Sequence, residues 1–132
     1  MEHGRARLAD HRWRGVGGGL TRATRWDAVP DYLNTAHEEL CLIVQVESRA
    51  GVENVEAIAA VPGVDVLMIG PADFSILAGI PFQLNHQLVH DAYRRVANAA
   101  KQAGKAWGTT SGSAEHSQML LDLGAKFVCH NA

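Results

Sequence analysis

The strongest constraint on the fold is an alternation, from residue 31 onward, between short apolar runs and longer amphipathic segments. The short runs are apolar throughout, which is typical of strands buried on both faces in a parallel sheet. The segments between them carry apolar residues at helical spacing, most clearly over residues 89–100. This order predicts an α/β fold with a parallel sheet and about four βα units, which can be half a (β/α)₈ barrel or a small open sheet. The strands are expected at residues 41–46, 64–69, 105–109 and 125–129.

Helix boundaries follow from capping residues, proline and glycine. Pro30 begins a helix expected through about Glu39, and Ser113 is the expected N-cap of a short last helix. A single amphipathic helix is expected over residues 52–59. Residues 70–81 contain glycine and proline without a clear apolar period, so we expect a long loop with one helical turn around Phe74–Leu77.

Composition and charge exclude several classes of protein. The 132 residues are 47% hydrophobic and 20% charged, which excludes wholesale disorder. No apolar run, Leu40–Val44 included, approaches the ~20 residues that span a bilayer, so we expect no membrane segment. Residues 1–25 carry six arginines, but the net charge is −2 and we expect no nucleic-acid partner. Cys41 and Cys129 lie in apolar runs of a chain without a secretory signal, so we expect buried, reduced thiols and a cytoplasmic protein.

Two acidic residues follow neighbouring predicted strands. Glu47 comes directly after the first strand, and Asp73 lies on the segment after the second. Because adjacent parallel strands lie ~4.8 Å apart and end at the same edge of the sheet, the two carboxylates can converge and serve as oxygen ligands of Mg²⁺ or Mn²⁺. The alternative is that each is a solvated loop acid. Gln45 lies on the same face of its strand as Glu47, and Gly70 allows the backbone to approach a ligand closely.

The sequence around these residues resembles successive blocks of the HpcH/HpaI aldolase family, which has the citrate lyase β-like proteins as relatives. The resemblance extends over residues 14–130, and it is most specific at Glu47 and Asp73, which stand in the family's order and spacing. The blocks that carry it are Arg14–Gly19, Arg22–Trp26, Pro30–Leu33, Val44–Ser48, Gly51–Val55, Val61–Asp65 and Ile69–Ser75.

The resemblance implies a fold and a chemistry. Members of this family are class II, metal-dependent aldolases, so it implies cleavage of 4-hydroxy-2-oxo (2-oxo-3-deoxy) acids to pyruvate and an aldehyde. It implies a (β/α)₈ TIM barrel, of which this chain would contain the part equivalent to strands five to eight. It further implies that Glu47 and Asp73 coordinate the divalent metal, Mg²⁺ or Mn²⁺, with Co²⁺ as a further candidate. Gln45, Ala72 and Asp73 would contact the pyruvate part of the substrate.

The departures from the family pattern are equally specific. The first four βα units have no counterpart in the chain, and with them the histidine that serves as general base. We therefore expect a partial barrel that retains the metal and pyruvate site, has no catalytic base of its own and is weakly active or inactive in isolation. Residues 1–13 are expected to form a divergent basic arm, and residues 14–132 a partial aldolase domain. His130, just after the last strand, is either a substitute polar group or a solvated residue.

Two other functions remain open from the sequence. One is a citrate lyase β-like acyl-CoA lyase, although residues 26–132 are net acidic and a groove for the CoA phosphates would be basic. The other is a catalytically inactive half-barrel that acts as an association module. Half a barrel leaves two parallel edge strands unpaired, so we expect a homo-oligomer or completion by another chain.

Overall fold

The computed structural model describes residues 18–130. The chain divides after Cys41 into two compact units, which are described separately. The predicted boundary near residue 13 lies outside the described residues and stays a prediction.

The first unit contains a short 3₁₀ helix, η2 (Gly18–Leu20), and one α-helix, α1 (Tyr32–Glu39). Helix α1 begins two residues later than predicted because Asp31 has a left-handed backbone, with φ of 55°, that does not continue a right-handed helix. The Asp31 side chain instead accepts a hydrogen bond of 2.6 Å from Asn34 Nδ2.

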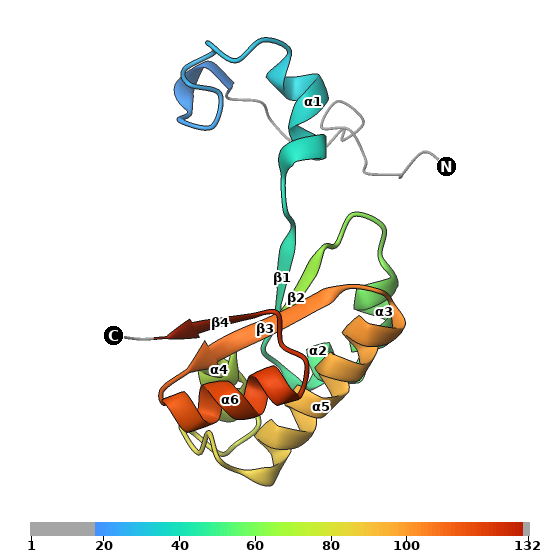
Figure 1. Cartoon of the computed structure of the whole chain (residues 1–132), viewed down its shortest axis with the longest axis vertical. Coiled ribbons are helices and arrows are strands. Elements are labelled where there is room, and N and C mark those ends of the chain that lie inside the picture. Colours follow the sequence, from blue (N-terminus) through green and yellow to red (C-terminus); the bar gives the residue numbers. More distant parts are fainter. Residues whose placement is uncertain (1–17, 131–132) are drawn as a thin grey trace. The chain divides into compact units, whose positions relative to one another are not determined.

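The second unit is built on a four-stranded parallel sheet (Figure 1). Its strands stand in chain order, each paired with the next, so the prediction of a parallel α/β fold with four strands is confirmed. The third strand runs two residues beyond its predicted end, because Thr110 and Ser111 pair with the last strand. The strands are β1 (Ile43–Val46), β2 (Val66–Ile69), β3 (Ala106–Ser111) and β4 (Phe127–His130).

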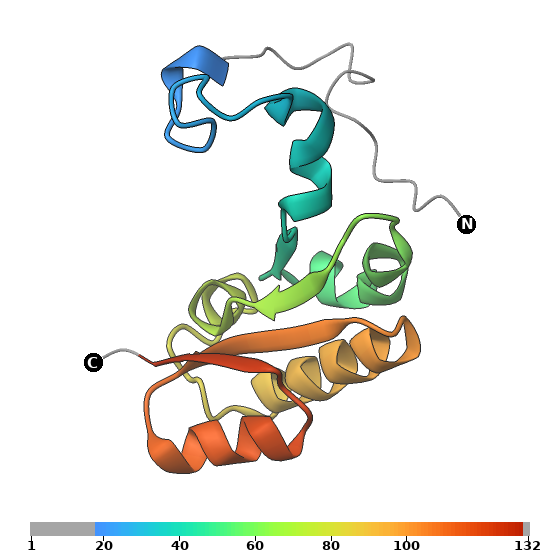
Figure 2. The same cartoon turned by 45° about the horizontal axis from the view of Figure 1, so that its top comes forward.

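Helices connect consecutive strands, as parallel pairing requires. Helix α5 packs on β2 and β3, and α6 packs on β3 and β4; both lie on the same side of the sheet (Figure 2). The shorter α2, α3 and α4 pack against α5. The helices are α2 (Arg49–Glu53), α3 (Val55–Ala60), α4 (Pro71–Leu77), α5 (Gln87–Gln102) and α6 (Ala114–Asp122).

Two of the predicted connections were wrong. The single helix expected over residues 52–59 is two helices, because the chain turns at Asn54, whose Nδ2 donates to Ala50 O at 2.8 Å. Within the segment expected to be a long loop, the helical turn expected around Phe74–Leu77 is the second half of a longer helix, α4, which begins at Pro71. Proline fits there because the first turn has no intrahelical acceptor for its missing N–H.

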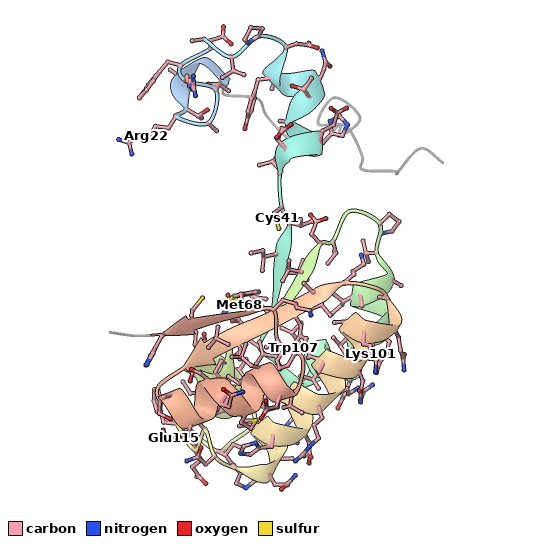
Figure 3. All side chains as sticks on the ribbon, viewed as in Figure 1. Arg22, Cys41, Met68, Lys101, Trp107 and Glu115 are labelled. Atoms are coloured by element: carbon pink, nitrogen blue, oxygen red, sulfur yellow. The ribbon has the colours of Figure 1, made fainter. Side chains whose placement is uncertain are left out.

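The core lies between the sheet and the helices. The apolar period of α5 faces it: Val89, Tyr93 and Val96 have no exposed area. Side chains of the strands alternate between this core and the opposite face of the sheet. Trp107 lies on the side of the core and Met68 on the opposite face (Figure 3). We call the second face the open face, and its strand residues are Ile43, Gln45, Val66, Met68, Ala106, Gly108, Thr110, Phe127 and Cys129.

The cysteine prediction was wrong about burial. Cys41 and Cys129 are free thiols, but both are exposed. Cys41 precedes β1, and Cys129 lies on the open face of the edge strand β4, so no strand or helix of the second unit covers the latter. Among the described residues, no helix is long and apolar enough to cross a membrane.

Candidate functional site

The site predicted from the sequence begins at the carboxyl end of β1. Val46 is 2% exposed and belongs to the core, so its neighbours Gln45 and Glu47 lie on the open face. There Gln45 Nε2 donates a hydrogen bond of 2.7 Å to Glu47 Oε2. The amide therefore holds the carboxylate in one orientation.

Gly70 lies against this pair at the end of the neighbouring strand. Its N–H donates to Val46 O at 3.1 Å, which extends the β1–β2 ladder by one residue. A Cβ at this position would lie 2.7 Å from Gln45 Nε2 and 2.9 Å from Glu47 Oε2. Both separations are closer than real Cβ contacts, so a larger residue would displace the two side chains. Close approach, rather than backbone conformation, is what requires glycine here.

Helix α4 places the second predicted carboxylate. Asp73 is exposed in its first turn, three residues after Gly70. Phe74 N–H donates to Gly70 O at 2.9 Å and is the first intrahelical donor, which leaves the N–H groups of Ala72 and Asp73 without an intrahelical acceptor. The helix thus begins at the same edge of the sheet as the Gln45–Glu47 pair.

The open face beside this edge combines apolar and small side chains. Gln45, Met68, Gly108 and Phe127 stand in register across the four strands. A Cβ on Gly108 would lie 2.5 Å from two ring atoms of Phe127, so the ring covers this glycine. One pair nearer the carboxyl edge, Thr110 is in register with Cys129. A ligand bound above Gln45 would therefore contact a mainly apolar surface of the sheet.

His130 is the last residue of β4 and is exposed. Val128, two residues earlier, packs against the core. Alternation therefore assigns His130 to the helix-covered face, opposite Gln45 and Glu47.

The donor set fits a hard divalent cation of the Mg²⁺ type. Within residues 18–130, no group of three or more His, Cys, Asp or Glu side chains could hold a metal ion. Mg²⁺ is nevertheless commonly held by only one or two carboxylates, with waters and substrate oxygens as its other ligands. Glu47 and Asp73 would supply the two carboxylates, and Gln45 donates a hydrogen bond to the first of them.

Comparison with known proteins identifies the family. The family profile described as "HpcH/HpaI aldolase/citrate lyase" matches residues 6–130. The chain belongs to this family. The chain is 52% identical over 122 residues to a hydroxypyruvate/pyruvate aldolase of Delftia acidovorans, covering 92% of this chain and 45% of that relative. It is 40% identical to a 4-hydroxy-2-oxo-heptane-1,7-dioate aldolase of Shigella sonnei, covering 87% of this chain and 44% of that relative.

A solved structure of the HpcH/HpaI family supports the same assignment. The family protein from Burkholderia cenocepacia J2315 aligns with a TM-score of 0.81 and 41% identity, covering 90% of this chain and 46% of that one. The aligned family structures are TIM-barrel aldolases, so the four βα units correspond to part of such a barrel, as predicted. The chain spans about half the length of the curated relatives it matches.

Reasoning from the sequence missed one residue beside the site. Ser75 was expected only as part of a helical turn within a long loop, and it lies fully buried in α4. The signal available was a serine two residues after Asp73, within helical reach of the Ala72 carbonyl.

Proposed function

We propose that this chain carries the metal- and pyruvate-binding part of a class II aldolase site that cleaves or forms 4-hydroxy-2-oxo acids. The observation that carries the proposal is the Gln45–Glu47 hydrogen bond of 2.7 Å, which lies directly over Gly70 at the carboxyl edge of the sheet. A Cβ at Gly70 would have to displace the ends of both side chains from this arrangement. A carboxylate with an amide donor beside it, at the edge where the parallel strands end, suits a ligand-binding role better than that of an unpartnered loop acid.

Each residue has a distinct role in this proposal. Glu47 and Asp73 would hold the divalent cation, and Gln45 would keep the Glu47 carboxylate oriented by donating to its Oε2. The N–H groups of Ala72 and Asp73, without acceptors in their own helix, would donate to the carboxylate of a bound pyruvate moiety. The bound cation would supply Lewis-acid stabilisation of the negative charge that develops on the keto oxygen during carbon–carbon cleavage.

The substrate class follows from the relatives and from the site. Relatives are named for hydroxypyruvate/pyruvate and for 4-hydroxy-2-oxo-heptane-1,7-dioate, both built on a 2-oxo acid. The residues above recognise only the 2-oxo acid end, so the aldehyde part is open. Proton transfer requires a base that we do not assign to this chain. We propose that the base belongs to the remainder of the barrel, on the same or another polypeptide.

Metal binding tests the proposal directly. The affinity of the 132-residue chain for Mn²⁺ is measured by electron paramagnetic resonance for the parent and for Glu47→Gln and Asp73→Asn, which keep side-chain size. Loss of a ligand should weaken binding by about tenfold or more. Gly70→Ala should weaken it comparably, without loss of charge, because the added Cβ displaces Gln45 and Glu47.

Two variants serve as matched controls. Glu53→Gln and Asp122→Asn remove one exposed carboxylate each, on α2 and on α6, and should bind Mn²⁺ like the parent. Equal affinity of the parent, Glu47→Gln and Asp73→Asn would overturn the proposed site. An equal fall in affinity in the four variants that remove a carboxylate, with parent-like affinity of Gly70→Ala, would mean that net charge, rather than this site, holds the ion.

A further inference from the structure

Ser75 lies at the centre of a small hydrogen-bond network under the first turn of α4. Its side chain has no exposed area. Its hydroxyl donates to Ala72 O at 2.6 Å and accepts from Phe82 N–H at 2.9 Å. Its carbonyl accepts from Ile80 N–H at 2.9 Å. One residue therefore joins the start of α4 to the segment that follows the helix.

The bond to Phe82 stabilises an unusual backbone. Phe82 has φ of 58°, in the left-handed region that residues with a side chain rarely adopt. Its ring is 71% exposed, so burial of the ring in this chain does not compensate for the strained backbone. Two hydrogen bonds hold this conformation: Phe82 N–H donates to the buried Ser75 hydroxyl, and Gln83 N–H donates to Ile80 O at 3.1 Å across the turn that contains Phe82.

The first turn of α4 is thus anchored at both ends. Before the turn, Gly70 is bound to Val46 and packed against Glu47. After it, Ser75 is bound to Ala72 and Phe82. Asp73 lies between the two anchors, and its carboxylate is exposed. The position of Asp73 relative to the edge of the sheet therefore depends on both the Gly70 contacts and the Ser75 hydrogen bonds.

We propose that Ser75 is a positioning residue for the site, which sets the place of Asp73 and of the Ala72 N–H through the backbone of α4. The proposal rests on the function proposed above, because it assumes that Asp73 holds the cation. Ser75 itself touches neither the cation nor the substrate. Loss of its hydroxyl would leave Ala72 O and Phe82 N–H without this partner and would release the turn from its second anchor.

Ser111 offers a matched comparison within the same chain. It is also buried, at 5% exposure, and its hydroxyl donates to Ser113 O at 2.9 Å and accepts from Ser113 N–H at 3.4 Å. These bonds join β3 to the start of α6 rather than to α4. Ser111→Ala therefore removes a hydroxyl of the same kind without touching the turn that carries Asp73.

The experiment compares Mn²⁺ affinity and thermal stability of Ser75→Ala and Ser111→Ala, at a temperature where both variants are folded. Both should unfold at lower temperature than the parent. Ser75→Ala should weaken Mn²⁺ binding by about tenfold, as loss of a supporting hydrogen bond does at other metal sites. Ser111→Ala should change it by less than about twofold. If Ser75→Ala does not fold, Ser75→Cys, which nearly keeps the volume but is a weak hydrogen-bonding group, replaces it.

A double variant separates positioning from a general loss of stability. In the Asp73→Asn background, Ser75→Ala should cause little further loss of Mn²⁺ affinity, because the ligand that it positions is already gone. A full additional loss would overturn the inference, as would parent-like affinity of Ser75→Ala. Parent-like affinity of Glu47→Gln and Asp73→Asn would instead refute the proposed function, so the two failures are distinguishable.

Discussion

His116 is a partly buried polar side chain outside the proposed site. Its ring packs against Tyr93, with centroids 5.8 Å apart, and its Nε2 is buried without a hydrogen-bond partner in the part of the chain that the structure describes. Burial, with a smaller contribution from the charge of His90, lowers the pKa of His116 below its ordinary value of 6.5. The neutral imidazole is therefore the form that the fold accommodates.

This shift predicts a loss of stability in mild acid. Because the folded pKa of His116 lies below the unfolded one, the unfolded state binds its proton first as pH falls. Stability should be fully present above about pH 6.5 and should decrease below it, through the folded pKa. Urea unfolding midpoints between pH 5 and pH 8 measure this dependence. His116→Gln should flatten it in this window, and an unchanged slope would assign the dependence to other groups.

Individual site residues were predictable where local geometry alone decides their placement. The pairing of Gln45 with Glu47 follows from the alternation of side chains along one strand, and the structure brings them into contact. Gly70 was predicted to let the backbone approach a ligand; the structure shows the Gln45 and Glu47 side chains close to it, and the contact with a ligand stays a prediction. Ser75 was not predicted, since its partner Phe82 is seven residues away across a turn.

Among the helices and strands, predictions succeeded where the apolar period is long. Helix α5 spans four turns of regular apolar spacing, so its existence and buried face followed from the sequence. Helix α4 has only seven residues, with proline in its first turn and Gly79 soon after its end. Those residues are typical of a loop, and packing of Phe74 and Ala78 in the core stabilises the helix instead.

The pairing of β3 with β4 depends on a glycine under an aromatic ring. A Cβ on Gly108 would lie 2.5 Å from the Phe127 ring and 2.5 Å from Phe127 O. Gly108→Ala should therefore lower the free energy of unfolding by about 1–3 kcal/mol, because a backbone atom cannot move aside as a side chain can. Gly112→Ala is the control, since nothing lies within 4 Å of its Cβ position. Equal urea midpoints for the two variants would contradict this account of the strand pair.

Taken by itself, the described part of the second unit, residues 42–130, leaves one face and two edges of its sheet uncovered. Strands β1 and β4 are the edges, and exposed apolar residues such as Ile43 lie on the open face. Unpaired parallel edges and an apolar face favour association with another sheet. The chain also spans about half the length of its relatives. This agrees with a sheet whose edge strands pair with further strands.

We therefore predict that the 132-residue chain associates in solution. Light scattering coupled to size-exclusion chromatography should give a mass above that of the 14.2 kDa monomer. Ile43→Lys should reduce association because it places a charge on the open face. Leu121→Lys, at an equally exposed residue of α6, should leave it unchanged. A folded monomer at all concentrations would rule out both self-association and the idea that this face requires a partner.

Local order along the chain was sufficient to predict the fold class, the four strands and the placement of Glu47 and Asp73 after neighbouring strands. These predictions depend on the spacing of apolar side chains, on turn residues and on the common direction of parallel strands. Short stretches of sequence are enough to recognise each of these features. Tertiary packing decided the rest: the helical state of α4, the two anchors of its first turn and the face on which each strand residue lies. Such features depend on contacts between residues distant in the chain, and no local pattern encodes which distant partner a side chain will meet.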